Sequence, residues 1–307
     1  MDVSIIIPTY NRLWSLPMAV ASCFASQLTI EVIIIDDGSI DGTWAWLQQQ
    51  ANIIAIKQQN MGKDWAVNAG FALANGKYIR FLDSDDWLLP GSTDKLFNAA
   101  ESEGLEVVCA GYQLFDHQEL LVKEISWTVC DDFIAQQLGE CDSSHYSAYL
   151  FRKDFINDIP HRQEYGALDD RKFMIEIALK GPKIGYIDAL TFAHRIHENE
   201  RLQSPSVLQD ASIQLARYNI YKKALQLLAE RGDLTQRRKN ACCHILWHLA
   251  HWVAKTDIKT GKEIYDWIFE LQPRFKPNEN TSLQRMYKNM GFVHTEKLLT
   301  FRRLLKR

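Results

Sequence analysis

Short apolar runs alternate with amphipathic segments along the N-terminal part of the chain. The runs are rich in β-branched residues and carry apolar side chains at successive positions, which is typical of strands buried on both faces of a parallel sheet. They comprise Val3–Ile7, Val32–Ile35, Ile53–Ile56 and Tyr78–Leu82. Between the first two runs, Leu16, Val20 and Cys23 recur at helical spacing. This alternation of strand and helix predicts a doubly wound α/β sheet.

The pattern changes after Pro90. One more helix and two further strands are expected, the strands at Val107–Tyr112 and Tyr146–Arg152. Residues 113–145 are rich in Asp, Gln and Ser, so we expect them to be irregular. Beyond residue 205 the apolar residues keep helical spacing, which predicts a C-terminal helical appendage.

Composition places the chain among globular proteins. Its 307 residues are 47% hydrophobic and its formal net charge is -3, so we expect a sizeable core and no nucleic-acid partner. Six cysteines without C-x-x-C or zinc spacing favour reduced thiols in a reducing compartment. We find no signal peptide and no apolar run of the ~20 residues that a membrane span needs. We therefore expect a soluble or peripheral protein in the cytoplasm or at the cytoplasmic face of the membrane. The oligomeric state stays open.

Carboxylates gather directly after the strand predicted at Tyr78–Leu82. Side chains alternate along an extended segment, so Asp83 and Asp85 point the same way, with Asp86 beside them. Like charges this close repel each other unless a cation lies among them. Carboxylate oxygens suit Mg²⁺ or Mn²⁺, which usually complete their coordination with water and substrate phosphates. The stretch predicts a metal–diphosphate site, and the alternative is a solvated acidic turn.

Two other predicted strands also end in polar residues. Thr9–Arg12 follows the first strand, and Asp36–Ser39 follows the second. In doubly wound sheets, ligands bind at the edge formed by the carboxyl ends of the strands. Three strands that deliver polar residues to one edge are much stronger evidence for a site than any single motif. For Asp36–Ser39 alone, a turn with helix-capping chemistry is the alternative.

These clusters, in their order and spacing, resemble the family-2 inverting glycosyltransferases of the GT-A fold. The resemblance is specific over about the first 90 residues and weaker to about residue 200. It implies a nucleotide-sugar donor (usually UDP-linked), a divalent metal (Mn²⁺ or Mg²⁺), and a glycan or lipid-linked acceptor. Bacterial-type surface polysaccharide or glycolipid assembly would use such a transfer. The matching motifs are Ile7-Pro8-Thr9-Tyr10-Asn11, Ile35-Asp36-Asp37-Gly38-Ser39, Asn60-x-Gly62, Asn68-x-Gly70 and Gly76-Lys77-Tyr78-x-x-Phe81-Leu82-Asp83-Ser84-Asp85-Asp86.

The resemblance also implies a division of the chain. Residues 1–204 would form the GT-A catalytic domain, with a nucleotide-binding half at 1–112 and an acceptor-binding half at 113–204. Residues 205–307 would form the helical C-terminal region, which lies outside the resemblance.

Donor binding is implied for residues of the matching motifs. Asp37 would accept a hydrogen bond from uracil or approach the ribose. Many relatives carry arginine just before the motif asparagine, where this chain has Val67. Lys63 could supply the missing charge, although a solvated lysine is an equal alternative. The implied donor-binding residues are Pro8, Thr9, Tyr10, Asn11, Asp37, Lys63, Asn68, Asp83 and Ser84.

Metal ligation and base catalysis are implied at three further places. Asp85 would bind the metal directly, and Asp86 would contact metal-bound water or the sugar. His197 would contact the metal or the diphosphate, or else serve a structural role in its strand. The pair Asp169-Asp170 resembles the acidic pair of the family, with Asp170 as the base and Asp169 as its support. The alternative for this pair is an acidic helix N-terminus stabilised by the helix dipole.

The C-terminal segment 295–307 has the pattern of a basic amphipathic helix. We expect weak contact with anionic lipid surfaces there, and a terminal helix docked on its own domain is the alternative. Its basic residues are Lys297, Arg302, Arg303, Lys306 and Arg307, and its apolar residues are Leu298, Phe301 and Leu305.

Two other functions stay open. A nucleotidyltransferase could use a similar sheet, although such enzymes usually carry a Gly-rich, Lys/Arg-containing loop after the first strand, which this chain lacks. A non-catalytic nucleotide-sugar-binding or scaffold protein would keep Asp37 and could tolerate the loss of Asp170.

His244, His248 and His251 lie at helical spacing, which favours a helix face over a metal stripe.

Overall fold

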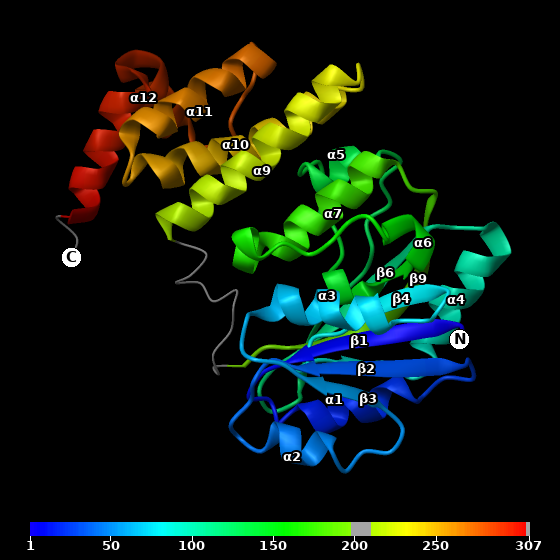
Figure 1. Cartoon of the computed structure of the whole chain (residues 1–307). Helices are drawn as coiled ribbons and strands as arrows, with labels where there is room; N and C mark the ends of the chain where they lie inside the picture. Colours follow the sequence, from blue (N-terminus) through cyan, green and yellow to red (C-terminus); the bar gives the residue numbers. More distant parts are fainter. Residues whose placement is uncertain (198–209, 305–307) are drawn as a thin grey trace. The chain divides into compact units, whose positions relative to one another are not determined.

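The computed structural model describes residues 1–197 and 210–304, and it is drawn in Figure 1. The chain forms two compact units. The first holds the described residues of Met1–Asp131 and Asp142–Glu200, and the second holds those of Asp132–Cys141 and Arg201–Arg307. The predicted boundary at residue 204 lies outside the described residues.

The first unit is built on one mixed sheet. Within the described residues the sheet has nine strands in the order β3-β2-β1-β4-β8-β6-β9-β5, and β7 pairs with β6. Strands β1 to β4 pair in parallel with one another, as does β6 with β9, whereas β8, β5 and β7 pair antiparallel with their neighbours. The strands are β1 (Val3–Thr9), β2 (Ile30–Asp36), β3 (Ile54–Lys57), β4 (Tyr78–Phe81), β5 (Trp87–Leu88), β6 (Val107–Phe115), β7 (Leu121–Ile125), β8 (Tyr149–Arg152) and β9 (Ile184–Arg195).

Helices cover both faces of this sheet, as expected for a doubly wound fold. Figure 1 shows α3 and α7 on the side of the sheet opposite α1 and α2. The helices of the unit are α1 (Leu16–Cys23), α2 (Thr43–Leu47), α3 (Lys63–Leu73), α4 (Ser92–Glu103), α6 (Lys153–Ile156) and α7 (Asp169–Lys180), with 3₁₀ segments η1 (Tyr146–Ala148) and η2 (Gln163–Leu168).

The position of β1 within the sheet explains why apolar residues occupy successive positions along it. Ile5 and Ile7 face the core formed with α1 and α4, where Leu16 and Leu96 are also fully buried. Ile6 points to the other face and lies against α3 at Gly70. Both faces of the strand are covered, so its inner positions are apolar on both sides, except for buried Ser4, whose hydroxyl donates to Glu31.

The second unit is helical. Its α5 (Phe133–Gln137) begins at Asp132, whose side chain accepts a hydrogen bond from the amide of Ala135. Arg238 Nε donates to Asp132 Oδ2 over 2.9 Å, which ties α5 to α10. Gly291, with φ 74°, interrupts α12. The other helices are α9 (Ala211–Glu230), α10 (Gln236–Ala254), α11 (Ile258–Leu271) and α12 (Thr281–Leu304).

The prediction of an irregular segment at 113–145 was wrong. Strand β6 continues to Phe115 and pairs with β7, and α5 follows within the same segment. Strand β7 lies at an edge of the sheet, and Leu121 and Val122 are more than half exposed. A strand with no buried face leaves no hydrophobic alternation in its sequence. The strand predicted at Tyr146–Arg152 is shorter in the structure. Its first three residues form η1, and β8 begins at Tyr149.

The predictions for the C-terminal region are partly covered by the described residues. Leu298 and Phe301 are exposed, at 39% and 58%, whereas residues 305–307 lie outside the described residues. No helix of the described chain is both long and apolar enough to cross a bilayer. His251 Nδ1 lies 2.7 Å from Glu296 Oε1, so this histidine has an acidic partner that the sequence did not reveal.

The packing of α3 on β1 gives a test of the fold. A methyl group on Gly70 would lie 2.6 Å from Ile6 Cγ2. We expect Gly70→Ala to destabilise the protein by about 1–3 kcal/mol through overpacking, although alanine is favoured over glycine in a helix by ~1 kcal/mol. Urea denaturation measures the change. Ala72→Gly, at an exposed position of the same helix, reports the propensity effect alone, and a stabilised Gly70→Ala protein would contradict the packing described here.

Candidate functional site

The polar ends of β1, β2 and β4 meet at one edge of the sheet, as the sequence predicts. Thr9 is paired with Asp36 in the sheet register, and the amide of Asp37 donates to Thr9 O over 2.8 Å. Ser15 Oγ donates to Ser84 O over 2.8 Å, which fixes the turn after β4 to the segment after β1. The three polar clusters therefore form one continuous site.

Asp37 holds a loop in place at this edge. It is 4% exposed. Its Oδ1 accepts from Gln58 Nε2 and from the amide of Met61, at 2.7 and 2.9 Å. Its Oδ2 accepts from the amide of Gly62 over 2.8 Å. Asp37 thus positions the segment that leads into α3, and a carboxylate oxygen with one protein partner can still accept a second hydrogen bond.

The predicted donor-binding residues at the end of β1 lie beside the turn that follows β2. Tyr10 is 39% exposed, whereas Thr9 is buried and its Oγ1 has no hydrogen-bond partner within the described residues. Asn11 adopts φ 51°, and its Oδ1 accepts from the amide of Ile40 over 2.9 Å. Pro8 is buried inside β1. The group therefore combines buried and accessible side chains beside the turn after β2.

Asp85 forms an ionic contact with the end of β9. Its Oδ2 lies 2.9 Å from His197 Nε2 and 3.7 Å from Arg12 Nε. Burial would raise the pKa of Asp85, but the His197 hydrogen bond and the Arg12 charge outweigh it and lower the pKa to about 2. The carboxylate is therefore ionised at neutral pH and able to bind a cation.

Asp86 is more deeply buried than its neighbour. Its Oδ1 accepts from the amide of Arg195 over 2.9 Å, and its Oδ2 lies 3.0 Å from His194 Nδ1. Burial raises the pKa of Asp86 to about 6, against the opposing effect of His194. Both oxygens are engaged by β9, so Asp86 fixes that strand end beneath the site.

The three carboxylates fit a divalent cation. Oxygen atoms of Asp83, Asp85 and Asp86 lie within 4.8 Å of one another. Clustered carboxylate oxygens are the donors that Mg²⁺ and Mn²⁺ prefer. His197 Nδ1 is buried without a hydrogen-bond partner among the described residues, while its Nε2 faces Asp85.

Lys63 connects this cluster to the start of α7. Its Nζ lies 2.7 Å from Asp83 Oδ1 and 3.4 Å from Asp170 Oδ2. Burial opposes the charged form of Lys63, but Asp170 and Asp83 raise its pKa above the ordinary value. The pKa of Asp170 is also raised, chiefly by burial. For Lys63 the sequence left two roles open, a place in the donor site or a solvated position. In the structure Lys63 contacts both carboxylates.

Asp169 faces away from Lys63 into a buried network. One oxygen contacts His161 Nδ1, and the other accepts from the amide of Arg162 over 2.6 Å. His161 Nε2 lies 2.8 Å from the hydroxyl of Tyr146. Asn68, which was predicted to bind the donor, completes the arrangement, because its side chain bonds the backbone of His161 at both N–H and C=O.

A match to a family model shows to which family the chain belongs. The model for Glycosyl transferase family 2 matches residues 4–155, which include all the strand-end clusters. The chain belongs to glycosyl transferase family 2.

Relatives agree with this family, and the solved structures show the GT-A fold. The chain is 24% identical over 269 residues to the putative glycosyltransferase EpsH of Bacillus subtilis, covering 80% of this chain and 74% of the relative. It is 32% identical over 174 residues to the undecaprenyl-phosphate 4-deoxy-4-formamido-L-arabinose transferase of Yersinia pestis, covering 53% and 52%. The structure of S. aureus TarS 1–349 in complex with UDP-GlcNAc is similar with a TM-score of 0.58 at 15% identity, covering 100% of this chain and 93% of that one.

Several residues of this family-2 site were missed from the sequence. His161 lies in a segment without periodicity, Tyr146 was seen only as the start of a predicted strand, and Arg12 only as the end of a polar turn. Asp64, two residues after the Asn60-x-Gly62 motif, was not singled out, yet it is 6% exposed and lies beside Asp169. A carboxylate in the first turn of a helix is common, so the sequence offered no signal that distinguishes these positions.

Asp64 gives a test of the electrostatics. Burial, with the charge of Asp169, raises its pKa to about 7 from an ordinary 3.8. Between these values the folded state keeps a proton that the unfolded chain has lost, so stability falls as pH rises through this window. We expect Asp64→Asn to be more stable than the wild type at about pH 8, on the order of 1–3 kcal/mol, with the difference vanishing near pH 4.

Thermal unfolding across this pH range checks the expectation. Asp188→Asn, at an exposed position of β9, is the matched control and should follow the wild type throughout. If the Tm of Asp64→Asn equals that of the wild type at every pH, ionisation of the buried Asp64 carboxylate does not lower the stability of the fold.

Proposed function

We propose that the chain is a metal-dependent inverting glycosyltransferase that moves a sugar from a UDP-linked donor to an acceptor hydroxyl. The carrying observation is the Lys63 bridge, because it places Asp170 next to the strand-end carboxylates. An inverting transfer needs a base close to the point where the acceptor attacks the donor. The TarS complex with UDP-GlcNAc supports a UDP-sugar donor, and the Yersinia relative supports a lipid-linked acceptor in surface glycan assembly.

The donor would bind across the edge formed by β1, β2 and β4. Asp85 and His197 would hold a divalent metal together with Asp83, and Asp86 would reach it through a water molecule, since its own oxygens are engaged. When bound, Mn²⁺ or Mg²⁺ would supply positive charge to the departing diphosphate. Lys63 would add a second cation on the same side.

The two neighbouring aspartates differ in what they can do. Both oxygens of Asp169 are committed, to His161 and to the amide of Arg162. Asp170 bonds only to Lys63 among the described residues, through Oδ2, so Oδ1 is available to a hydroxyl. Asp170 would therefore take the proton of the acceptor, and Asp169 would hold the start of α7 in place.

The metal site is tested by Asp85→Asn. Removing this charge takes away one ligand and relieves repulsion among the carboxylates, so the fold should persist. We expect Mn²⁺-dependent binding of UDP, measured calorimetrically, to be abolished. Asp188→Asn should bind as the wild type does. Unchanged UDP affinity in Asp85→Asn would remove this residue from the metal site.

The base is tested by Asp170→Asn. We expect kcat for UDP release in the presence of an acceptor to fall by ~10²–10⁴, while the Kd for UDP–Mn²⁺ stays nearly unchanged. Asp169→Asn is the contrasting variant, because it breaks the His161 contact and should lower Tm. Near-normal turnover in Asp170→Asn, or loss of donor binding instead, would move the base elsewhere.

The same assay separates the other functions. A non-catalytic nucleotide-sugar-binding protein would bind UDP-sugars with Mn²⁺ and release no UDP. A nucleotidyltransferase would instead consume a nucleoside triphosphate and release diphosphate.

A further inference from the structure

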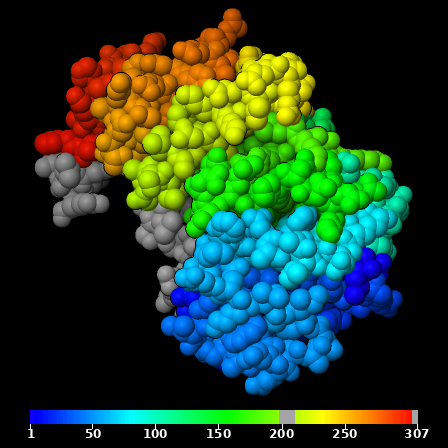
Figure 2. Space-filling model, in the orientation of Figure 1, coloured from blue at the N-terminus to red at the C-terminus, as the bar shows by residue number. Residues whose placement is uncertain are grey.

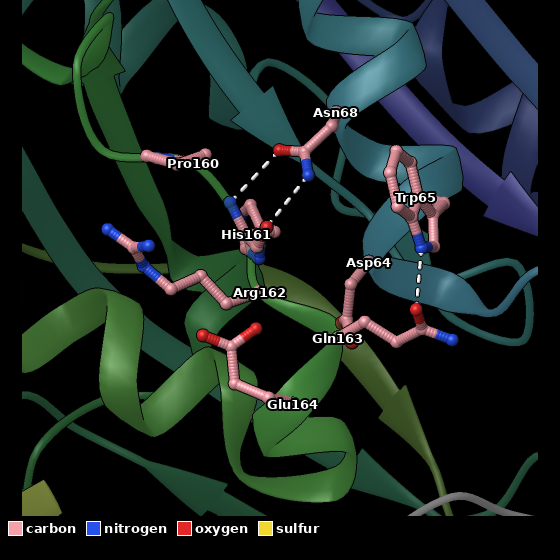
Figure 3. A pocket seen from close by; sticks show the side chains of 8 residues that line it. All are labelled: Asp64, Trp65, Asn68, Pro160, His161, Arg162, Gln163 and Glu164. Atoms are coloured by element: carbon pink, nitrogen blue, oxygen red, sulfur yellow. Dashed lines mark hydrogen bonds between the residues drawn. The ribbon is translucent and has the colours of Figure 1, made fainter.

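A cavity of 610 Å³ lies between the first turns of α3 and the segment at 160–164. Figure 3 shows Trp65 and Asn68 on the α3 side, and Arg162 and Glu164 on the opposite side. On the face drawn in Figure 2, the blue surface of α3 meets the green surface that follows residue 160. The lining residues are Asp64, Trp65, Asn68, Pro160, His161, Arg162, Gln163 and Glu164.

The cavity is connected to the acidic pair by two separate paths. Lys63 contacts Asp170, and the next residue, Asp64, lines the cavity. His161 also lines the cavity and contacts Asp169. The pair at the start of α7 therefore has the strand-end carboxylates on one side, through Lys63, and the cavity on the other.

The wall of the cavity offers one held aromatic ring. Trp65 is 48% exposed, a large fraction for a tryptophan in a folded protein. Its Nε1 donates to Gln163 Oε1 over 2.8 Å, and Gln163 Nε2 donates to Met61 O over 3.1 Å. The indole is therefore fixed by a bond across the cavity, so little conformational freedom would be lost when a ligand packs on it.

The polar lining excludes some ligands and favours others. Asp64 and Glu164 are acidic and Arg162 lies 3.9 Å from Glu176, so two carboxylates stand against one guanidinium in the lining, which is a poor match for a phosphate. A pyranose has C–H groups on its faces and hydroxyls around its rim. An exposed indole with carboxylate, carboxamide and guanidinium groups around it matches both parts of such a ring.

We propose that this cavity binds an uncharged pyranose of the acceptor, stacked on Trp65. The assignment rests on the proposed function, since it takes the cavity to hold part of the acceptor whose hydroxyl Asp170 would deprotonate. It gives Trp65 and Gln163 a role in acceptor recognition, and it places that recognition on α3 and the segment at 160–164.

The test measures sugar binding without a donor. Saturation-transfer NMR would use the methyl β-glycosides of glucose, galactose and N-acetylglucosamine as probes. The variants are Trp65→Ala, Trp65→Phe and, as a matched control, Phe24→Ala, which removes a 44% exposed ring at the end of α1. We expect the wild type and Phe24→Ala to bind at least one probe equally. Trp65→Ala should weaken this binding by about tenfold, and Trp65→Phe should keep most of it.

A second measurement separates this inference from the proposed function. UDP–Mn²⁺ affinity and UDP-sugar hydrolysis should be unchanged in Trp65→Ala, because the strand-end site does not include this ring. Two results would contradict the acceptor site and leave the proposed transferase function in place. In the first, the wild type hydrolyses a UDP-sugar but binds no probe. In the second, Trp65→Ala binds the probes as well as the wild type does. Trp65-dependent probe binding in a protein that turns over no UDP-sugar would overturn both.

Discussion

The charge of Lys63 is the constraint on which the site depends. Its ammonium group lies between Asp83, at the end of a strand, and Asp170, at the start of a helix more than 80 residues later. Without this cation, the carboxylates would repel each other in poorly hydrated surroundings. Asp85 is compensated in the same way by His197 and Arg12, so each acidic group of the rim has a basic partner from a distant segment.

A second layer beneath the rim makes two adjacent aspartates different. Asp169 is 1% exposed and is held by His161, which in turn contacts Tyr146 and stacks on Phe173 at a centroid distance of 4.3 Å. Side chains locked by packing and hydrogen bonds hold their neighbours in a defined geometry. Asp170, the next residue along the same helix, points out of this layer and meets Lys63. The hydrogen-bonded network and the proposed base are thus adjacent in sequence, and the network holds the start of the helix that carries Asp170.

Much of the fold could be predicted because burial leaves a periodic record. The runs that became β1, β2 and β4 are buried on both faces, and the helical spacing of α1 follows from packing on one face. The same reasoning failed for β7 and α5. Strand β7 is exposed at the edge of the sheet, and α5 is only one turn long, so neither leaves a hydrophobic period. The family resemblance anticipated the GT-A fold as a whole, and the structural comparison confirmed it.

The sequence alone determined which chemical groups stand at the ends of the strands, because alternation along a strand and the common direction of parallel strands fix where those side chains go. It could not determine which distant groups meet them. The contacts Lys63–Asp170 and Asp85–His197 arise only when α7 and the end of β9 pack against the first half of the sheet, and Asp169–His161 joins α7 to the segment just before it. A pattern of period two or 3.6 describes one element at a time. The pairing of charges between elements is decided by tertiary packing, where the cost of an uncompensated buried charge selects the partners.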